Sequence, residues 1–259
     1  MHATNNPQAE NESQGLSKVA AVTFSFWIIK ILCTTLGETG GDAVTMSMNL
    51  GYLVGTMIFA VIFLVAVVSQ VLAKRFHPAL YWTTIVATTT VGTTMADFAD
   101  RSLGIGYAGG TAILLSLLLA SLGVWYWAAG TVAVDTVGSP KTEIFYWVTI
   151  MFSQTLGTAL GDWAADDAGL GYRGGIVAFS LLLLIVAALY FWTKISRTFL
   201  FWAAFILTRP LGAVLGDALD KPVADGGLNL SRYTASAAMV VAIVACVLIF
   251  PKRAAEKAH

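Results

Sequence analysis

A tryptophan followed fifteen residues later by an aspartate occurs four times in this chain, and this repeat restricts the fold more than any other feature. The four copies run over residues 27–42, 82–97, 147–162 and 202–217. An aromatic residue also stands directly before each tryptophan. Because copies at fixed spacing indicate one structural unit used several times, the chain is expected to be built from four similar parts.

Small residues precede each aspartate at fixed distances. A glycine lies five residues before it, and glycine or alanine lies directly before it. The glycines are Gly37, Gly41, Gly92, Gly157, Gly161, Gly212 and Gly216. Small residues four apart let the backbones of membrane helices approach closely. The sequence therefore predicts that the helices carrying the repeat pack tightly against one another.

The composition is that of an integral membrane protein. Charged residues make up 12% of the chain, apolar residues make up 57%, and the mean hydropathy is +0.75. Average globular domains carry about 25% charged residues. A membrane span needs about 20 mostly apolar residues. Eight segments fit, at residues 19–42, 51–73, 78–97, 107–130, 141–162, 172–193, 197–217 and 231–250. A lipid bilayer is therefore an expected partner.

Eight spans and four motifs predict an all-α integral membrane fold of four parallel helical hairpins related by pseudo-symmetry. The hairpins cover about residues 20–73, 78–130, 141–193 and 197–250. The odd-numbered spans, which carry the glycines, should form the inner ring, and the even-numbered spans should face lipid. This membrane domain, residues 18–253, is expected between a polar, disordered tail at residues 1–17 and a short tail at residues 254–259.

The loop charges predict the orientation. Nine lysines and arginines fall on one side of the membrane and four on the other, which places both termini in the cytoplasm. The tryptophans are then expected to anchor the cytoplasmic interface as an aromatic belt. These residues are Trp27, Trp82, Trp147 and Trp202. Fifteen helical residues rise about 22 Å, so each motif aspartate should lie near the opposite face.

The motif aspartates are the main candidates for function. Asp42, Asp97, Asp162 and Asp217 would meet at one height if the repeats surround an axis. Four carboxylates repel one another unless some are protonated or a cation lies between them, and hard cations prefer oxygen ligands. Hydroxyls lie one to two turns further inward, at Thr34, Thr35, Thr90, Thr93, Thr155 and Thr158. We expect a cation site or pathway here, which could hold a metal ion, and no other cofactor. The alternative is that each aspartate caps its helix end through backbone N–H groups.

Three ionisable residues break the fourfold pattern deeper in the spans. Glu38 lies one turn inward of Asp42, and Arg209 occupies the position of Thr34 in the fourth copy. Repeats one and four would be neighbours in a closed ring, so these two are expected to pair, either as a structural lock or as a cation carrier gated by Arg209. Lys30 is a second candidate counter-charge, or it extends to the cytoplasmic face.

Motifs of several enzyme classes are missing from the sequence. It contains no HExxH zinc motif, no glycine-rich phosphate loop and no GxSxG nucleophile motif. The neutral net charge gives no reason to expect a nucleic-acid partner. We therefore expect a transporter or channel for a small cation and not an enzyme, with a divalent metal substrate, proton coupling and a homo-oligomer left open. The alternatives are a transporter of a small organic or anionic solute, or a structural or sensory membrane protein without transport.

Four tandem two-span repeats, each with a tryptophan and a GxxxGD-like signature, resemble a bacterial family of uncharacterised four-repeat membrane proteins. This family is often labelled "membrane-anchored protein". The resemblance covers about residues 20–250, and it implies eight spans and a location in the bacterial inner membrane. It implies little about activity. The fourth copy departs from the pattern, with Arg209, Pro210 and Ala213 in place of polar residues.

Overall fold

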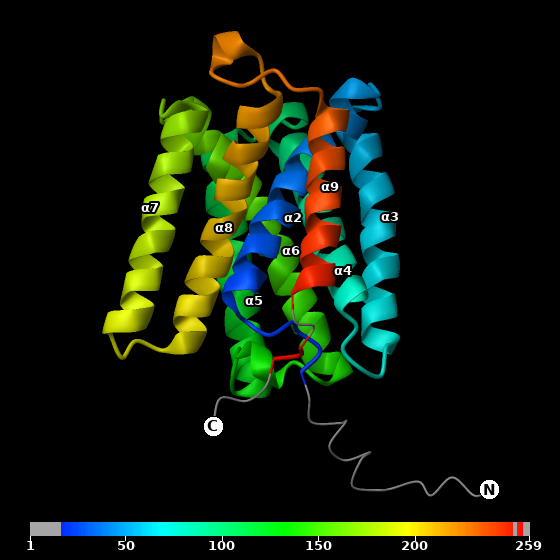
Figure 1. Ribbon diagram of the computed structural model, residues 1–259, viewed down its shortest axis with the longest axis vertical. Coiled ribbons are helices and arrows are strands. Elements are labelled where there is room, and N and C mark those ends of the chain that lie inside the picture. The colour runs from blue at the N-terminus through cyan, green and yellow to red at the C-terminus, as the bar shows by residue number, and fades with distance from the viewer. Residues whose placement is uncertain (1–16, 251–252, 256–259) are drawn as a thin grey trace, which may run out of the picture.

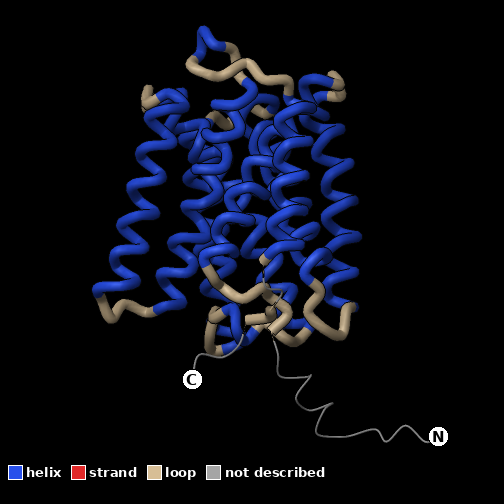
Figure 2. Tube along the Cα trace, viewed as in Figure 1, coloured by secondary structure: helices blue, strands red, loops and turns tan. Residues whose placement is uncertain are grey.

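Eight long helices alternate in direction between two ends of a bundle (Figure 1). The computed structural model describes residues 17–250 and 253–255. The helices are α2 (Phe24–Asp42), α3 (Gly51–Leu72), α4 (Pro78–Asp97), α5 (Tyr107–Ala129), α6 (Pro140–Asp162), α7 (Gly171–Trp192), α8 (Arg197–Asp220) and α9 (Arg232–Ile249). Figure 2 shows that the loops gather at the two ends and that the described chain contains no strand, in agreement with the predicted all-α class.

Four of the helices form a closed inner ring. Helix α2 packs against α4 and α8, and α6 packs against the same two helices. The other four lie outside, with α3 on α4, α5 on α6, α7 on α8 and α9 on α2. Each outer helix therefore covers the inner helix of the following repeat, and α9 covers that of the first. This arrangement confirms the predicted inner ring and links the repeats cyclically.

The motif glycines make the close helix contacts of this ring. The glycine five residues before each aspartate lies against one equivalent position of the next repeat. The pairs are Gly37 with Thr89, Gly92 with Gln154, Gly157 with Arg209 and Gly212 with Thr34. A Cβ atom at any of the four would lie 3.0 Å or less from these neighbours. The last pair joins α8 to α2 and closes the ring.

The second small residue of the motif makes a further set of contacts at three of the four interfaces. A Cβ atom at Gly41 would lie 3.2 Å from Thr93, one at Gly161 would lie 3.0 Å from Ala213, and one at Gly216 would lie 2.6 Å from Glu38. A side chain at these positions would push the helices apart, which costs stability in a packed core. These glycines therefore lie at close contacts between the inner helices.

The outer helices are apolar on nearly their whole surface, whereas the inner ones carry their polar residues in the interior. Helices α3, α5, α7, α8 and α9 are long and apolar enough to cross a membrane. Helices α2, α4 and α6 are not among them. Exposed leucine, isoleucine, valine and aromatic side chains cover the outer helices. Such a surface is typical of helices in contact with lipid, so the chain has the character of a membrane protein.

The motif tryptophans pack within the bundle, so the predicted lipid-facing aromatic belt is wrong for most of them. Trp82, Trp147 and Trp202 are buried. The side-chain ring of each tryptophan lies 5.4–6.3 Å, between centroids, from that of the first aromatic residue in the preceding repeat. For the first repeat, the preceding one is the fourth. The pairs are Phe26 with Trp82, Tyr81 with Trp147, Tyr146 with Trp202 and Phe201 with Trp27. The tryptophans are therefore contacts between repeats.

Residues just before α2 close one end of the ring. The first span was expected from residue 19, but α2 begins at Phe24, after Thr23 whose hydroxyl accepts a hydrogen bond from the Phe26 N–H. Residues 17–20 are buried, and Ala20 forms an antiparallel bridge with Ala254. Most of the tails expected at residues 1–17 and 254–259 lies outside the described residues. The part within them, Ser17 with residues 254–255, is hydrogen-bonded to the domain rather than free.

Candidate functional site

Side chains at every fourth position of the inner helices form five stacked layers. Side chains four residues apart lie next to each other on a helix surface, and all of these are buried among the inner helices. The layers, from the end near Ser17, are Phe26/Tyr81/Tyr146/Phe201, Lys30/Ile85/Ile150/Phe205, Thr34/Thr89/Gln154/Arg209, Glu38/Thr93/Thr158/Ala213 and Asp42/Asp97/Asp162/Asp217. All twenty residues are buried. We call the first end of the ring the aromatic end and the last the carboxylate end.

Arg209 reaches from α8 into the layer of Glu38 and contacts three other helices. Its Nη2 atom lies 3.0 Å from Oε2 of Glu38 and 2.6 Å from Oγ1 of Thr93. The same nitrogen donates to Oγ1 of Thr158. The structure thus brings Glu38 and Arg209 together, and the guanidinium joins all four inner helices at one point.

The buried cations of this region are incompletely paired. Nε and Nη1 of Arg209 have no hydrogen-bond partner among the described residues. Nζ of Lys30 lies 3.5 Å from Oε1 of Gln154 and 4.2 Å from the ring centre of Phe205. Lys30 is fully buried, so its expected extension to the cytoplasmic face is wrong. It is instead a second basic residue enclosed by the inner ring.

The four motif aspartates form two bridged pairs rather than one ring. Lys221 lies 2.7 Å from Oδ2 of Asp42 and 3.1 Å from Oδ1 of Asp217. In the second pair, Arg101 lies 3.1 Å from Oδ1 of Asp97 and 3.2 Å from Oδ2 of Asp162. In each pair, the positive charge between the two carboxylates offsets their mutual repulsion.

The capping alternative for these aspartates is not supported. Asp42, Asp97 and Asp162 each end an α-helix and are followed by a five-residue π-helical turn, but their side chains make no capping hydrogen bond. Throughout the described ranges, no backbone N–H donates to any of the four motif carboxylates. Their partners are the side chains of lysine and arginine.

The carboxylate end carries more acid than base. Seven buried carboxylates lie there, from Glu38, Asp42, Asp97, Asp100, Asp162, Asp217 and Asp220. Their basic partners are Arg101, Arg209, Lys221 and Arg232. Seven acids against four bases leave an excess of three negative charges if all are ionised. Buried uncompensated charge is costly, so protons or bound cations are needed to balance it.

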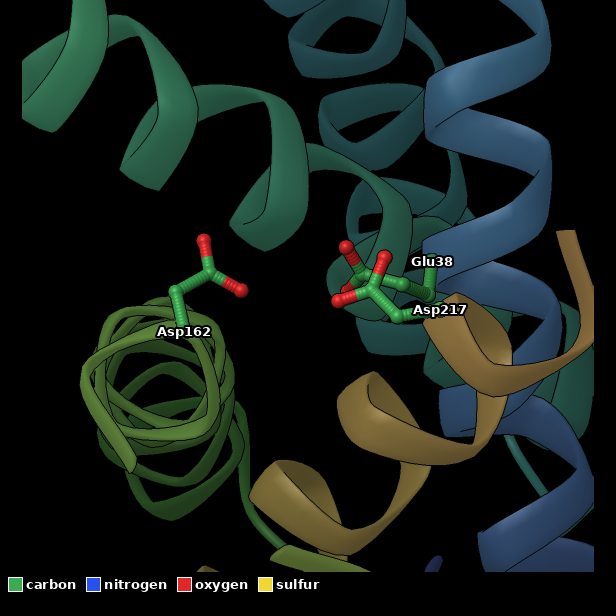
Figure 3. Close-up of side chains that lie close together, drawn as sticks. All are labelled: Glu38, Asp162 and Asp217. Carbon is green, nitrogen blue, oxygen red and sulfur yellow. The ribbon is translucent and has the colours of Figure 1, made fainter. Parts of the chain in front are cut away.

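Two groups of these carboxylates are close enough to share a metal ion. Oxygens of Glu38, Asp162 and Asp217 lie within 4.8 Å of one another, and Figure 3 shows Asp162 pointing from its helix toward the other two. Oxygens of Asp42, Asp217 and Asp220 satisfy the same limit. Asp97 belongs to neither group, so the four motif aspartates do not form one common set of ligands.

The predicted pathway hydroxyls divide into two sets. Thr93 and Thr158 contact Arg209 in the middle of the ring. The others donate to a carbonyl of their own helix, with Thr34 and Thr35 bonded to Ile31, Thr90 to Val86 and Thr155 to Met151. Of the six predicted hydroxyls, only Thr93 and Thr158 lie in the charged centre.

Arg101 and Lys221 were not recognised as site residues from the sequence, where they read as loop charges. Both stand four residues after a motif aspartate, a spacing that brings side chains together on a helical turn. Burial lowers the pKa of Lys221, but the carboxylates of Asp217, Asp42 and Asp220 raise it more, so the pKa lies well above its usual range. Lys221 therefore stays charged.

Asp100 lies at the same end in the π-helical turn after α4. Neither of its carboxylate oxygens has a hydrogen-bond partner among the described residues. Burial raises the pKa of Asp100 to about 6, although Arg101 beside it acts in the opposite direction. Asp100 is therefore a carboxyl that changes charge at a mildly acidic pH.

Comparisons with known proteins support the fourfold repeat. A family model described as "Repeat of Unknown Function (DUF347)" matches the chain at residues 25–76, 80–131, 145–196 and 200–253. Each match spans one inner helix and the outer helix that follows it. No curated protein and no solved structure matches the chain.

Proposed function

The chain belongs to the family of the Repeat of Unknown Function (DUF347), and from its fourfold ring we propose that it is a membrane transporter for a small cation. One observation carries the proposal: seven buried carboxylates surround one end of a closed helical ring, with only four basic partners. Ionisable groups within membrane helices are costly and mark ion pathways by default. An excess of buried acid attracts cations rather than anions.

The proposal includes eight membrane spans. Helices α2, α4 and α6 have 19–23 residues, close to the length that a bilayer requires. Their polar residues point into the ring, where neighbouring helices shield them from lipid. The excess of lysine and arginine on one side supports cytoplasmic termini, and the location is the inner membrane of a bacterium.

A carrier fits the two ends of the ring better than an open channel does. The aromatic end is filled by packed rings, and the hydroxyls of Tyr81 and Tyr146 are 2.7 Å apart. A cation attracted by Asp42, Asp97, Asp162 and Asp217 would reach Glu38 and stop there. It would continue only after the aromatic end opens. A divalent substrate and coupling to protons remain alternatives within this proposal.

Flux measurements on reconstituted vesicles test the proposal. Purified protein is inserted into liposomes, and the uptake of rubidium, sodium, methylammonium, manganese and zinc is measured across a range of pH. We expect cation uptake by the wild-type protein and its loss when all four motif aspartates are replaced by asparagine. Full uptake by that quadruple variant, shown to be folded by gel filtration, would exclude the proposal.

Transport of a small organic anion is a second candidate, favoured by one observation. Arg209 and Lys30 are both fully buried, and Glu38 is the one carboxylate paired with either of them in the described structure. An anion between the two cations would balance the second charge. Uptake of an organic anion such as acetate, blocked by Arg209→Gln, would favour this candidate. The absence of both cation and anion uptake would leave a structural or sensory role.

A further inference from the structure

One nitrogen of Arg209 occupies a site made of three oxygen atoms from three helices. The oxygens are Oε2 of Glu38 on α2, Oγ1 of Thr93 on α4 and Oγ1 of Thr158 on α6. All three residues are buried, and α8 supplies the arginine itself. We call these three oxygen atoms the cradle. It is a negatively charged, oxygen-lined position for one positively charged atom on the axis of the ring.

The guanidinium is only partly satisfied in this position. Nη2 makes the hydrogen bonds, whereas Nε and Nη1 are buried and have no partner within the described part of the chain. A buried donor without a partner costs free energy, which offsets part of the gain from the cradle. The Cβ and Cγ atoms of Arg209 lie against Gly157, so the stem is fixed at the α6 interface and only a rotation of the guanidinium head would vacate the cradle.

We propose that the cradle is the binding site of the transported cation and that Arg209 fills it only while the carrier is empty. This inference rests on the proposed transport of a cation. The substrate is then a small monovalent cation, such as an alkali ion or an ammonium. Such an ion supplies the single positive charge that Arg209 otherwise supplies to Glu38, the one carboxylate of the cradle. One nitrogen atom occupies the cradle, which fits a small ion better than an extended ligand.

The positive charge of Arg209 affects the step in which the empty carrier returns. After releasing its cation, an empty carrier must change back to the conformation that faces the other side of the membrane. An unpaired Glu38 carboxylate would oppose that step. With Arg209 in the cradle, the Glu38 carboxylate of the empty carrier is neutralised by the guanidinium, as it is by the cation in the loaded carrier. The wild-type protein should therefore catalyse both net flux and exchange. Without Arg209, it should exchange cations but fail to return empty.

Arg209→Gln separates these two activities. Rubidium-loaded liposomes are diluted into medium with or without rubidium, at pH 8 to limit protonation of Glu38. We expect net efflux by Arg209→Gln to fall about a hundredfold, because removing one partner of a buried ion pair is strongly unfavourable. Exchange should persist. Arg209→Lys, which keeps the charge, should retain net efflux.

Equilibrium binding gives an independent readout in detergent. Removing the internal competitor should let Arg209→Gln bind rubidium at least about tenfold more tightly than the wild-type protein, as measured by thermal stabilisation. Thr93→Val should weaken this binding. The matched control is Thr94→Val, because the Thr94 hydroxyl bonds only to its own helix at Val91, and it should leave binding unchanged.

Three results would overturn the inference: equal losses of net efflux and exchange, wild-type levels of both, or no gain in rubidium affinity. Its failure is distinguishable from failure of the proposed function. A wild-type protein that moves no cation defeats the transport proposal, while tighter rubidium binding by Arg209→Gln would still identify the cradle as a cation site.

Discussion

The aromatic end and the carboxylate end of the inner ring use the same four helices and the same spacing of four residues, but their chemistry differs. At the aromatic end, Phe26, Tyr81, Tyr146 and Phe201 fill the axis, and Tyr81 and Tyr146 share a hydrogen bond. At the carboxylate end, stability depends on a balance of acids and bases. Apolar packing does not respond to ions, whereas a charge balance does. We infer that the carboxylate end is where the molecule responds to its substrate.

The largest effect is expected at the centre of the charge balance. Glu38→Gln leaves Arg209 buried without its carboxylate, so the free energy of unfolding should fall by about 3–5 kcal/mol. The double variant Glu38→Gln with Arg209→Gln should recover most of the loss, because no unpaired charge remains. Denaturant unfolding of the purified proteins checks both. Equal stability of Glu38→Gln and the wild-type protein would mean that this pair does not hold the ring.

The next effect compares a ring glycine with a glycine of the outer layer. Gly157→Ala places a methyl group against Arg209 and should lower stability by about 1–3 kcal/mol. Gly123→Ala in α5 meets no atom within 4 Å and should raise stability by about 0.5–1 kcal/mol, since alanine favours a helix. Thermal unfolding of the two variants decides whether the ring is as closely packed as described, because equal shifts would contradict it.

A smaller effect is expected at the aromatic end. Tyr81→Phe removes the hydrogen bond to Tyr146 and should cost about 0.5–1.5 kcal/mol, independent of added salt or cations. Tyr126→Phe, at an exposed tyrosine of α5, is the matched control and should have no measurable effect. A strong cation dependence of the Tyr81→Phe effect would show that the two ends do not differ as proposed.

The smallest effect is a change of stability with pH at Asp100. Its pKa is raised from 3.8 to about 6, so the folded protein holds this proton more tightly than the unfolded chain does. Stability from this group is fully present below pH 3.8 and is lost as the pH rises through about 6. Asp100→Asn should lack this loss and should unfold at a higher temperature than the wild-type protein above pH 6. Parallel melting curves between pH 4 and pH 8 would contradict the assignment.

The regular features of this fold follow from the sequence because their cause is local and repeated. Glycines at the same offset in four copies predict the ring, and the ring makes neighbours of Glu38 and Arg209. The tryptophans were misassigned because a belt residue and a buried contact between repeats have the same sequence signal. Only the contact of each tryptophan with the preceding copy distinguishes them.

The irregular parts of the site depend on contacts that repetition does not determine. Arg101 and Lys221 occur in two copies only, and each bridges its own aspartate to that of a neighbouring repeat. Lys18, which counts as a loop charge in the sequence, is buried and lies 2.6 Å from Glu143. These partners are far apart in the chain, so a single sequence gives no measure of their distance.

The central claim, that the carboxylate end carries a cation across the membrane, is tested most directly by uptake into liposomes. The comparison is between Asp162→Asn, which removes a buried carboxylate beside Glu38, and Asp166→Asn, which removes an exposed one four residues later. We predict that Asp162→Asn lowers uptake at least about tenfold, as for the loss of one charged partner in a buried site, and that Asp166→Asn leaves it unchanged. Equal uptake by the two folded variants and the wild-type protein would contradict the claim.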